Sequence, residues 1–243
     1  MHILYFHQHF STPKGTGGTR SYELARRLIR RGCTVTMVCG TNLRAMSADD
    51  GLRTGQVRES RVDGIRVVEI VLPYSNYDGL IKRTVTFLRY ALAGIRLALR
   101  EDYDLLFATS TPLTAGIPGI AAKVLRRKPF VFEVRDLWPE LPKAMGVIGN
   151  PLILGMLSLL EWSSYRASDG CVALAPGIAE GIRRRSRSDH PICVVPNGCD
   201  LDLFNAQVIR QDVWPDFDDS DLVCIFTGAH GQANGLDAAL NAG

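Results

Sequence analysis

Short apolar runs alternate along the chain with longer segments in which apolar residues recur at helical spacing. The runs are continuous rather than alternating in polarity, which is typical of parallel strands covered on both faces. The pattern predicts eight strands, over residues 3–6, 34–38, 65–71, 105–108, 130–134, 170–173, 192–195 and 222–226. It predicts helices over residues 19–31, 81–100, 113–127, 152–167 and 178–185. This order indicates an α/β fold with a Rossmann-like, doubly wound parallel sheet.

A change in pattern near residue 197 divides the chain. After Pro196-Asn197-Gly198 the sequence becomes polar and loses its periodicity through residues 212–221. A strand, a glycine-rich turn and a helix are then predicted from residue 222 onward. We therefore expect a domain over 1–196, a linker over 197–221, and the opening β-turn-α of a second Rossmann domain over 222–243. In this interpretation the second domain is truncated.

Composition narrows the class of protein. Of the 243 residues, 46% are hydrophobic and 22% are charged, which is ordinary for a globular protein. The formal net charge of +3 is too small to indicate nucleic-acid binding. No secretory signal is visible, and the most apolar stretch, residues 153–160, is too short to span a bilayer. We therefore expect a cytoplasmic protein.

The cysteines form no CxxC pair, so neither a disulfide framework nor a zinc site is indicated. Most of them stand in or beside apolar runs, and we expect small buried thiols in a reducing compartment. The six are Cys33, Cys39, Cys171, Cys193, Cys199 and Cys224.

A glycine-rich segment, residues 15–18, separates the first strand from the first helix. In a doubly wound sheet this is the carboxyl end of a strand, where ligands bind, and a helix N-terminus favours an anion. The spacing is not GxGxxG, which argues against a dinucleotide, and a flexible turn is the alternative. His7 and His9 follow the same strand, but no nearby Cys, Asp or Glu completes a metal site. We expect one of them to contact substrate instead.

A charged segment, EVRDLWPE over residues 133–140, follows the predicted strand 130–134. Charges at this position need partners. Asp136 could hydrogen-bond to a substrate hydroxyl or accept its proton, and Trp138 could pack against a sugar face. The alternative is an internal pair between Arg135 and a carboxylate. Thr111 follows the preceding strand, either to contact substrate or to cap the helix that begins near Leu113.

The predicted helix 81–100 is strongly amphipathic. At 100° per residue, its basic residues fall within about 40° of one another, beside a broad apolar arc. This arrangement favours an anionic membrane surface, and the alternative is a packed helix with a solvated basic edge. The basic residues are Lys82, Arg89, Arg96 and Arg100.

The ordered motifs GTGGTR, RRGCTVTMV, FEVRDLWPE, PNGCDLDLF and FTGAHGQANGL closely resemble family 4 glycosyltransferases of the GT-B fold. The resemblance is to the fucosamine-transferase-like branch, which builds bacterial O-antigen, capsule and colanic-acid polysaccharides, and it covers essentially all 243 residues. It implies an N-terminal domain that binds a lipid-linked or polysaccharide acceptor and a C-terminal domain that binds a nucleotide-sugar donor. It also implies transfer of a hexosyl or N-acetylhexosaminyl group with retention, without a metal or another cofactor.

The resemblance gives roles to particular residues. Asp136 matches the residue near the acceptor hydroxyl and is the catalytic candidate. Gly228 matches the start of the donor-phosphate turn, and His230 stands where many members carry a basic residue. The expected interdomain hinge comprises Asn197, Gly198 and Asp200. The expected substrate-binding residues are His9, Gly17, Gly18, Arg20, Thr111, Glu133 and Trp138.

The glutamate-rich motif that holds the donor in this family would lie beyond residue 243. We therefore expect this chain to be inactive alone. One alternative is a non-catalytic acceptor- or membrane-binding half that works with a separate donor-binding chain. Another is a different GT-B activity, such as a sugar-nucleotide epimerase or a phosphorylase, which the DLWPE segment disfavours.

Overall fold

The computed structural model describes residues 1–15, 17–41, 54–73, 78–199, 201, 224–228 and 234–242. The chain divides into two compact units, Met1–Asn197 and Gly198–Gly243.

An eight-stranded sheet forms the centre of the first unit. Its strands are β1 (His2–Phe6), β2 (Thr34–Gly40), β3 (Val57–Val62), β4 (Ile65–Ile70), β5 (Leu105–Thr109), β6 (Phe130–Val134), β7 (Gly170–Ala173) and β8 (Ile192–Val194). Their order is β3-β4-β2-β1-β5-β6-β7-β8. All neighbours are parallel except β3 and β4, which form an antiparallel hairpin at one edge. The predicted α/β class and mostly parallel sheet are confirmed.

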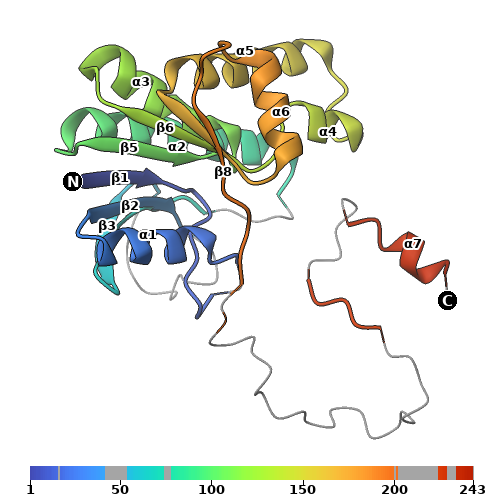
Figure 1. Ribbon diagram of the computed structural model, residues 1–243, viewed down its shortest axis with the longest axis horizontal. Coiled ribbons are helices and arrows are strands. Elements are labelled where there is room, and N and C mark those ends of the chain that lie inside the picture. Colours follow the sequence, from blue (N-terminus) through green and yellow to red (C-terminus); the bar gives the residue numbers. More distant parts are fainter. Residues whose placement is uncertain are drawn as a thin grey trace, which may run out of the picture. The chain divides into compact units, whose positions relative to one another are not determined.

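Helices cover both faces of this sheet (Figure 1). They are α1 (Arg20–Arg30), α2 (Leu80–Arg100), the 3-10 helix η2 (Leu113–Ala115), α3 (Gly116–Arg126), α4 (Glu140–Ala144), α5 (Pro151–Ala167) and α6 (Pro176–Arg185). Helix α1 packs on one face, over β2 and β4, while α3 packs on the other face between α2 and α5. The result is the doubly wound arrangement that alternating strands and helices predict.

Alternate residues along each strand supply the two cores. Leu4 and Phe6 of β1 join the larger core beneath α2, α3 and α5, whereas Ile3 and Tyr5 join the smaller core beneath α1. Helix α3 lies very close to β6, because a Cβ atom added at Gly119 would be only 2.2 Å from the Phe130 ring. Glycine is therefore required at this helix–sheet contact.

Several local expectations differ from the structure. The sequence pattern predicts neither β3 nor α4, because β3 is largely polar and exposed and α4 is only five residues long. The predicted helix 113–127 begins as the 3-10 turn η2 before α3. All six cysteines are free, but only Cys39 and Cys171 are buried. The expected burial is wrong for Cys193, Cys199 and Cys224; Cys193 lies on β8, which is an edge strand with one exposed side.

The second unit contains one described helix, α7 (Asp237–Leu240). The predicted strand 222–226 is absent from its described part, residues 224–226, where no neighbouring strand in the described chain supplies hydrogen bonds. A strand without such a partner leaves its backbone groups unpaired.

Candidate active site at the carboxyl ends of the strands

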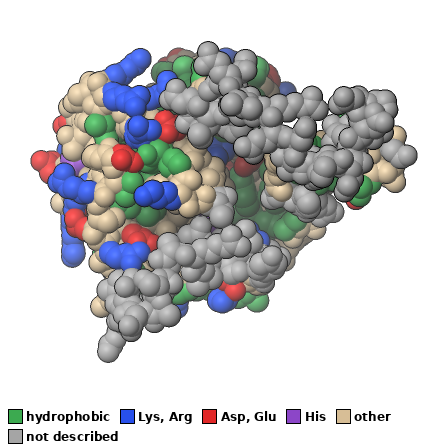
Figure 2. Space-filling view, turned by 90° about the horizontal axis from the view of Figure 1, so that it is seen from below, with side chains coloured by type: hydrophobic (Ala, Val, Ile, Leu, Met, Phe, Trp, Pro, Cys, Tyr) green, Lys and Arg blue, Asp and Glu red, His purple; other side chains and the backbone are tan. Residues whose placement is uncertain are grey.

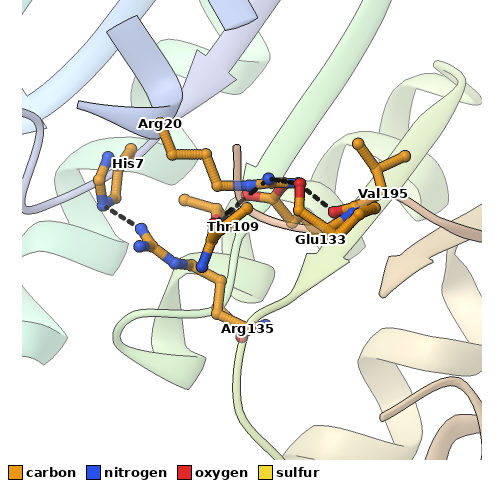
Figure 3. Close-up of polar contacts among 9 residues, drawn as sticks. His7, Arg20, Thr109, Glu133, Arg135 and Val195 are labelled. Atoms are coloured by element: carbon orange, nitrogen blue, oxygen red, sulfur yellow. Dashed lines mark hydrogen bonds and ion pairs between the residues drawn. The ribbon is translucent and has the colours of Figure 1, made fainter. Parts of the chain in front are cut away.

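The connection order of the sheet places a topological switch point between β1 and β5. From β1 the chain proceeds outward through β2 to β4, and it then returns to β5 on the other side of β1. Ligands of open α/β sheets bind outside the carboxyl ends of the strands at such a point. Polar side chains gather there at the ends of β1, β5 and β6 (Figure 3).

Glu133 is the fully buried charge in this cluster. Its Oε1 atom accepts a hydrogen bond of 3.0 Å from Nε of Arg20, and its Oε2 atom accepts one of 2.7 Å from the Thr109 hydroxyl. The Arg20 guanidinium also forms an ion pair of 2.9 Å with Oε1. Both carboxylate oxygens therefore have donors, which is what a buried charge requires.

Arg20 also holds the segment that follows β8. Its Nη1 atom donates to the carbonyl of Pro196 at 2.8 Å and to Oδ1 of Asn197 at 3.3 Å. Its Nη2 atom donates to the carbonyl of Val195 at 2.8 Å. Arg20 thus connects the start of α1, the end of β6 and the chain after β8. Arg20 and Glu133 thus form hydrogen bonds within the folded chain. Their expected contact with substrate stays a prediction.

Arg135 and His7 form the other half of the cluster, and their side chains point toward each other in Figure 3. Nη1 of Arg135 lies 3.3 Å from Nε2 of His7. A guanidinium only donates, so Nε2 accepts and a neutral His7 carries its proton on Nδ1. Burial, followed by the charge of Arg135, lowers the pKa of His7 well below its usual value. His7 is thus a neutral ring beside a permanent cation.

The alternative expectation of a pair between Arg135 and a carboxylate is wrong within the described chain. The nearby carboxylate of Glu133 pairs instead with Arg20, which is 113 residues away in the sequence. Among the residues that the structure describes, Arg135 contacts no acidic side chain. Its guanidinium therefore keeps donors that an anionic ligand could accept.

His9 lies at the edge of this cluster. Its ring meets Phe87 of α2 edge-on, with the centroids 6.3 Å apart. Burial, with smaller contributions from Arg83 and Arg135, lowers the pKa of His9 to about 4. His9 is therefore neutral near pH 7 and can donate or accept one hydrogen bond per ring nitrogen.

The shifted pKa of His9 predicts a pH effect on stability. Between about pH 4 and pH 6.5 the His9 ring is protonated in the unfolded chain and neutral in the folded chain. Unfolding therefore takes up a proton, and the free energy of unfolding falls as the pH is lowered. We expect His9→Gln to reduce the pH slope of the unfolding free energy in this window, by up to about 1.4 kcal/mol per pH unit. Urea unfolding at several pH values measures the slope. An NMR titration in which the His9 ring changes charge near pH 6.5 would contradict the prediction.

The other residues expected near substrate follow the same strand ends. Asp136 is partly buried, and its carboxylate makes no hydrogen bond or ion pair with any residue of the described chain. Trp138 is partly buried and packs against the larger core. The buried Thr111 hydroxyl has no partner in the described ranges, and η2 begins without a side-chain cap. The alternative role of Thr111 as a helix cap is therefore wrong.

The glycine-rich segment is shaped by a contact within the chain. The N–H of Gly17 donates to the Ser11 hydroxyl at 3.3 Å, and a Cβ atom at Gly17 would lie 3.0 Å from the Ser11 Cβ. At Gly15 an added Cβ would lie 2.3 Å from the Ser11 hydroxyl, whereas at Gly18 it would meet nothing within 4 Å. The contact with Ser11 thus explains why positions 15 and 17 are glycine. At Gly18 there is open space at the start of α1.

On the donor side the structure describes less. Asn197, Gly198 and Gly228 lie within the described residues, while Asp200 and His230 lie outside them. The hinge and donor-phosphate roles remain predictions. Across the described part of the chain, no group of three or more His, Cys, Asp or Glu side chains is placed to hold a metal ion.

Solved structures share this fold. Sucrose-phosphate synthase from Thermosynechococcus elongatus superposes with a TM-score of 0.60 at 15% identity, over 84% of this chain and 49% of that one. The catalytic domain of starch synthase IV from Arabidopsis thaliana, bound to ADP and acarbose, superposes with a TM-score of 0.53 at 14% identity, over 83% of this chain and 52% of that one. The chain thus spans about half the length of these structures. At such identities the likeness shows the fold.

Sequence comparison identifies the family. No curated protein matches the chain. A family model described as a glycosyl transferase 4-like domain matches residues 15–198, which include Arg20, Glu133, Arg135 and Asp136 of the site described above. The chain therefore belongs to the glycosyl transferase 4-like domain family.

Proposed function

We propose that this protein is a retaining glycosyltransferase of the GT-B type, and that the unit Met1–Asn197 forms its acceptor-binding side. The donor would be a nucleotide sugar and the acceptor a lipid-linked or polysaccharide sugar in bacterial surface polysaccharide biosynthesis. The observation that carries the proposal is that Arg135 and Asp136, consecutive residues after β6, have no ion-pair partner among the described residues. Membership of the glycosyl transferase 4-like family supports it.

The polar residues suit an acceptor that carries hydroxyls and a phosphate group. The guanidinium of Arg135 would bind phosphate oxygens, for which its planar donor set is suited. The carboxylate of Asp136 would accept a hydrogen bond from the acceptor hydroxyl and orient it toward the donor. Neutral His9 and the Thr111 hydroxyl would bind further hydroxyls, and Trp138 would cover an apolar sugar face.

In the proposed reaction, the acceptor oxygen forms a bond to the anomeric carbon of the donor sugar. The bond between that carbon and the donor phosphate breaks, and the nucleotide leaves with the electron pair. The acceptor hydroxyl passes its proton to the Asp136 carboxylate. The nucleotide sugar brings its own leaving group, so the proposal includes no further cofactor. We propose a cytoplasmic location at the inner membrane, where nucleotide sugars and lipid-linked acceptors would meet.

Transfer of radiolabelled sugar tests the proposal. The protein, as its complete gene encodes it, would be incubated with UDP- and ADP-sugars and with lipid-linked sugar acceptors in detergent. We expect label in the lipid fraction, with the anomeric configuration of the donor retained in the product as judged by NMR. Inversion of the configuration would overturn the retaining mechanism. Binding of acceptor without transfer from any donor would favour the alternative of a non-catalytic acceptor-binding half.

A further inference from the structure

Helix α2 presents its large aliphatic side chains to solvent. Ile81, Val85, Leu88 and Leu92 are all exposed, Ile81 by 84% and Leu92 by 61%. Their spacing of four, three and four residues places them in one stripe along the helix. The buried side of α2 contains Thr86, Tyr90 and small residues such as Ala91 and Ala98. The large aliphatic residues of the stripe thus stay outside the core, whereas large apolar residues usually face it.

A close helix contact explains why this stripe faces outward. A Cβ atom added at Gly94 would lie 2.7 Å from Pro118 of α3 and 3.0 Å from the Phe6 ring of β1. At this position the helix approaches its neighbours so closely that only glycine fits. The stripe from Ile81 to Leu92 lies on the opposite side of the helix.

Helices α3 and α5 repeat this pattern next to α2. Val124 and Leu125 of α3 are 68% and 66% exposed. Leu152, Met156, Leu159 and Trp162 form an exposed stripe on α5 at helical spacing. Because α3 packs between α2 and α5, the exposed apolar residues belong to neighbouring helices of one layer. We call these exposed residues the outer helix face.

The charges of the three helices are almost all positive. Together α2, α3 and α5 contain eight lysine and arginine residues and a single acidic residue, Glu161, which is buried and pairs with Arg185. Arg89, Arg96 and Arg100 are exposed beside the apolar stripe of α2 and form no ion pair with any described residue. The surface seen from below in Figure 2 instead mixes lysine and arginine with aspartate and glutamate.

These features fit a lipid bilayer better than a protein partner. Apolar residues with a basic border, on helices that have no acidic residue on their exposed sides, match the interface of an anionic membrane, where a helix lies in the plane of the surface. Arg166 lies over the Trp162 ring at 5.1 Å, and both residue types are favoured at the headgroup level. Of the helices that the structure describes, none has the length and apolarity needed to cross a membrane.

We propose that the outer helix face binds the surface of an anionic bilayer, with the aliphatic residues of α2, α3 and α5 entering the headgroup region. The face borders the candidate site, because Phe87 of α2 packs against His9. Bilayer binding would therefore hold a lipid-linked acceptor close to Asp136. Only this last step rests on the proposed function.

Vesicle flotation tests the surface without donor or acceptor, so its outcome is independent of glycosyl transfer. The probes are phosphatidylcholine vesicles with and without phosphatidylglycerol. We expect binding to the anionic vesicles, weakened about a hundredfold when Arg89, Arg96 and Arg100 are all replaced by glutamine, since each basic residue contributes about 1 kcal/mol near such a surface. A matched variant has the same change, arginine to glutamine, at Arg27, Arg30 and Arg31. These residues lie at the end of α1 on the other face of the sheet. Its affinity should change by only a few fold.

A second variant tests the apolar component. Leu92→Gln, Val124→Gln and Leu159→Gln together should weaken binding at least tenfold while circular dichroism and thermal unfolding stay unchanged, because all three side chains are exposed. Quenching of tryptophan fluorescence by brominated lipids should be largely lost in Trp162→Phe. Equal losses in the two arginine variants would overturn the proposal, as would a failure of the native protein to bind. A dimer in sedimentation that these leucine and valine changes abolish would assign the face to a second copy of the chain instead.

Discussion

Glu133→Gln should lower the free energy of unfolding of the unit Met1–Asn197 by about 3–5 kcal/mol, as expected when one partner of a buried ion pair is removed. The carboxylate is fully buried and accepts from both Arg20 and Thr109. An amide has only one acceptor oxygen, so one of these donors would face an N–H₂ group. The Arg20 side chain, only 13% exposed, would keep its charge without a counterion. Urea unfolding followed by circular dichroism measures the loss.

A partly exposed ion pair provides the matched control. Glu23 and Arg26 of α1 lie 3.2 Å apart, and each side chain is 32% exposed. Glu23→Gln makes the same chemical change in solvent and should cost less than about 1 kcal/mol. If the two variants lost equal stability, the pair between Glu133 and Arg20 would contribute no more than a surface contact. The network around Arg20 would then need another source of stability.

The strands that could be predicted are those whose side chains are buried on both faces. Residues 3–6 and Phe130–Val134 are continuous apolar runs because helices or connecting segments cover both sides of the sheet at β1 and β6. The hairpin of β3 and β4 follows another rule. Its turn residues, Asp63 and Gly64, have φ angles of 49° and 84°, and Asp-Gly at such positions is a strong hairpin signal. Turn chemistry could therefore have located β3, where hydrophobic periodicity could not.

Which side of α2 is buried could not be predicted from hydrophobicity alone. The sequence shows a broad apolar arc beside a basic stripe, and an apolar arc normally faces the core. The buried side is instead set by the close contact at Gly94, which depends on Pro118 and Phe6 from distant parts of the chain. Periodicity predicts where the helix begins and ends. Which of its sides faces the core depends on contacts with residues that are distant in the sequence.

The candidate site shows the same limit. Strand ends located the polar residues after β1, β5 and β6, because parallel strands bring these ends to one edge of the sheet. The partners could not be predicted in this way. Arg135 is two residues from Glu133, yet Arg20 forms the ion pair because α1 begins close to the end of β6. In the folded chain Arg135 lies beside His7 instead. The pair of Arg20 and Glu133 is therefore structural, whereas Arg135 is proposed to bind a ligand.

Asp136→Asn should reduce the rate of glycosyl transfer by about 10²–10⁴-fold, the range found when a group that handles a reacting proton is removed. The carboxylate makes no contact with another described side chain, so its loss should change the unfolding free energy by less than about 0.5 kcal/mol. The transfer assay described above, run over a range of acceptor concentrations, separates kcat from KM. We expect the loss mainly in kcat, because asparagine can still hydrogen-bond to the acceptor hydroxyl but cannot take its proton.

Two further variants give this result its meaning. Glu140→Gln changes an exposed carboxylate in the same charged segment and should leave transfer within a few fold of the native rate. Arg135→Gln should raise KM for a phosphate-bearing acceptor, since it removes the cation proposed to bind phosphate oxygens. A native rate in Asp136→Asn would remove this residue from the reaction and direct attention to the remaining polar groups at the strand ends. A lower rate accompanied by unfolding would show instead that Asp136 supports the fold. The proposed role of Asp136 toward the acceptor hydroxyl is supported only if Asp136→Asn loses kcat while it stays folded and Glu140→Gln remains active.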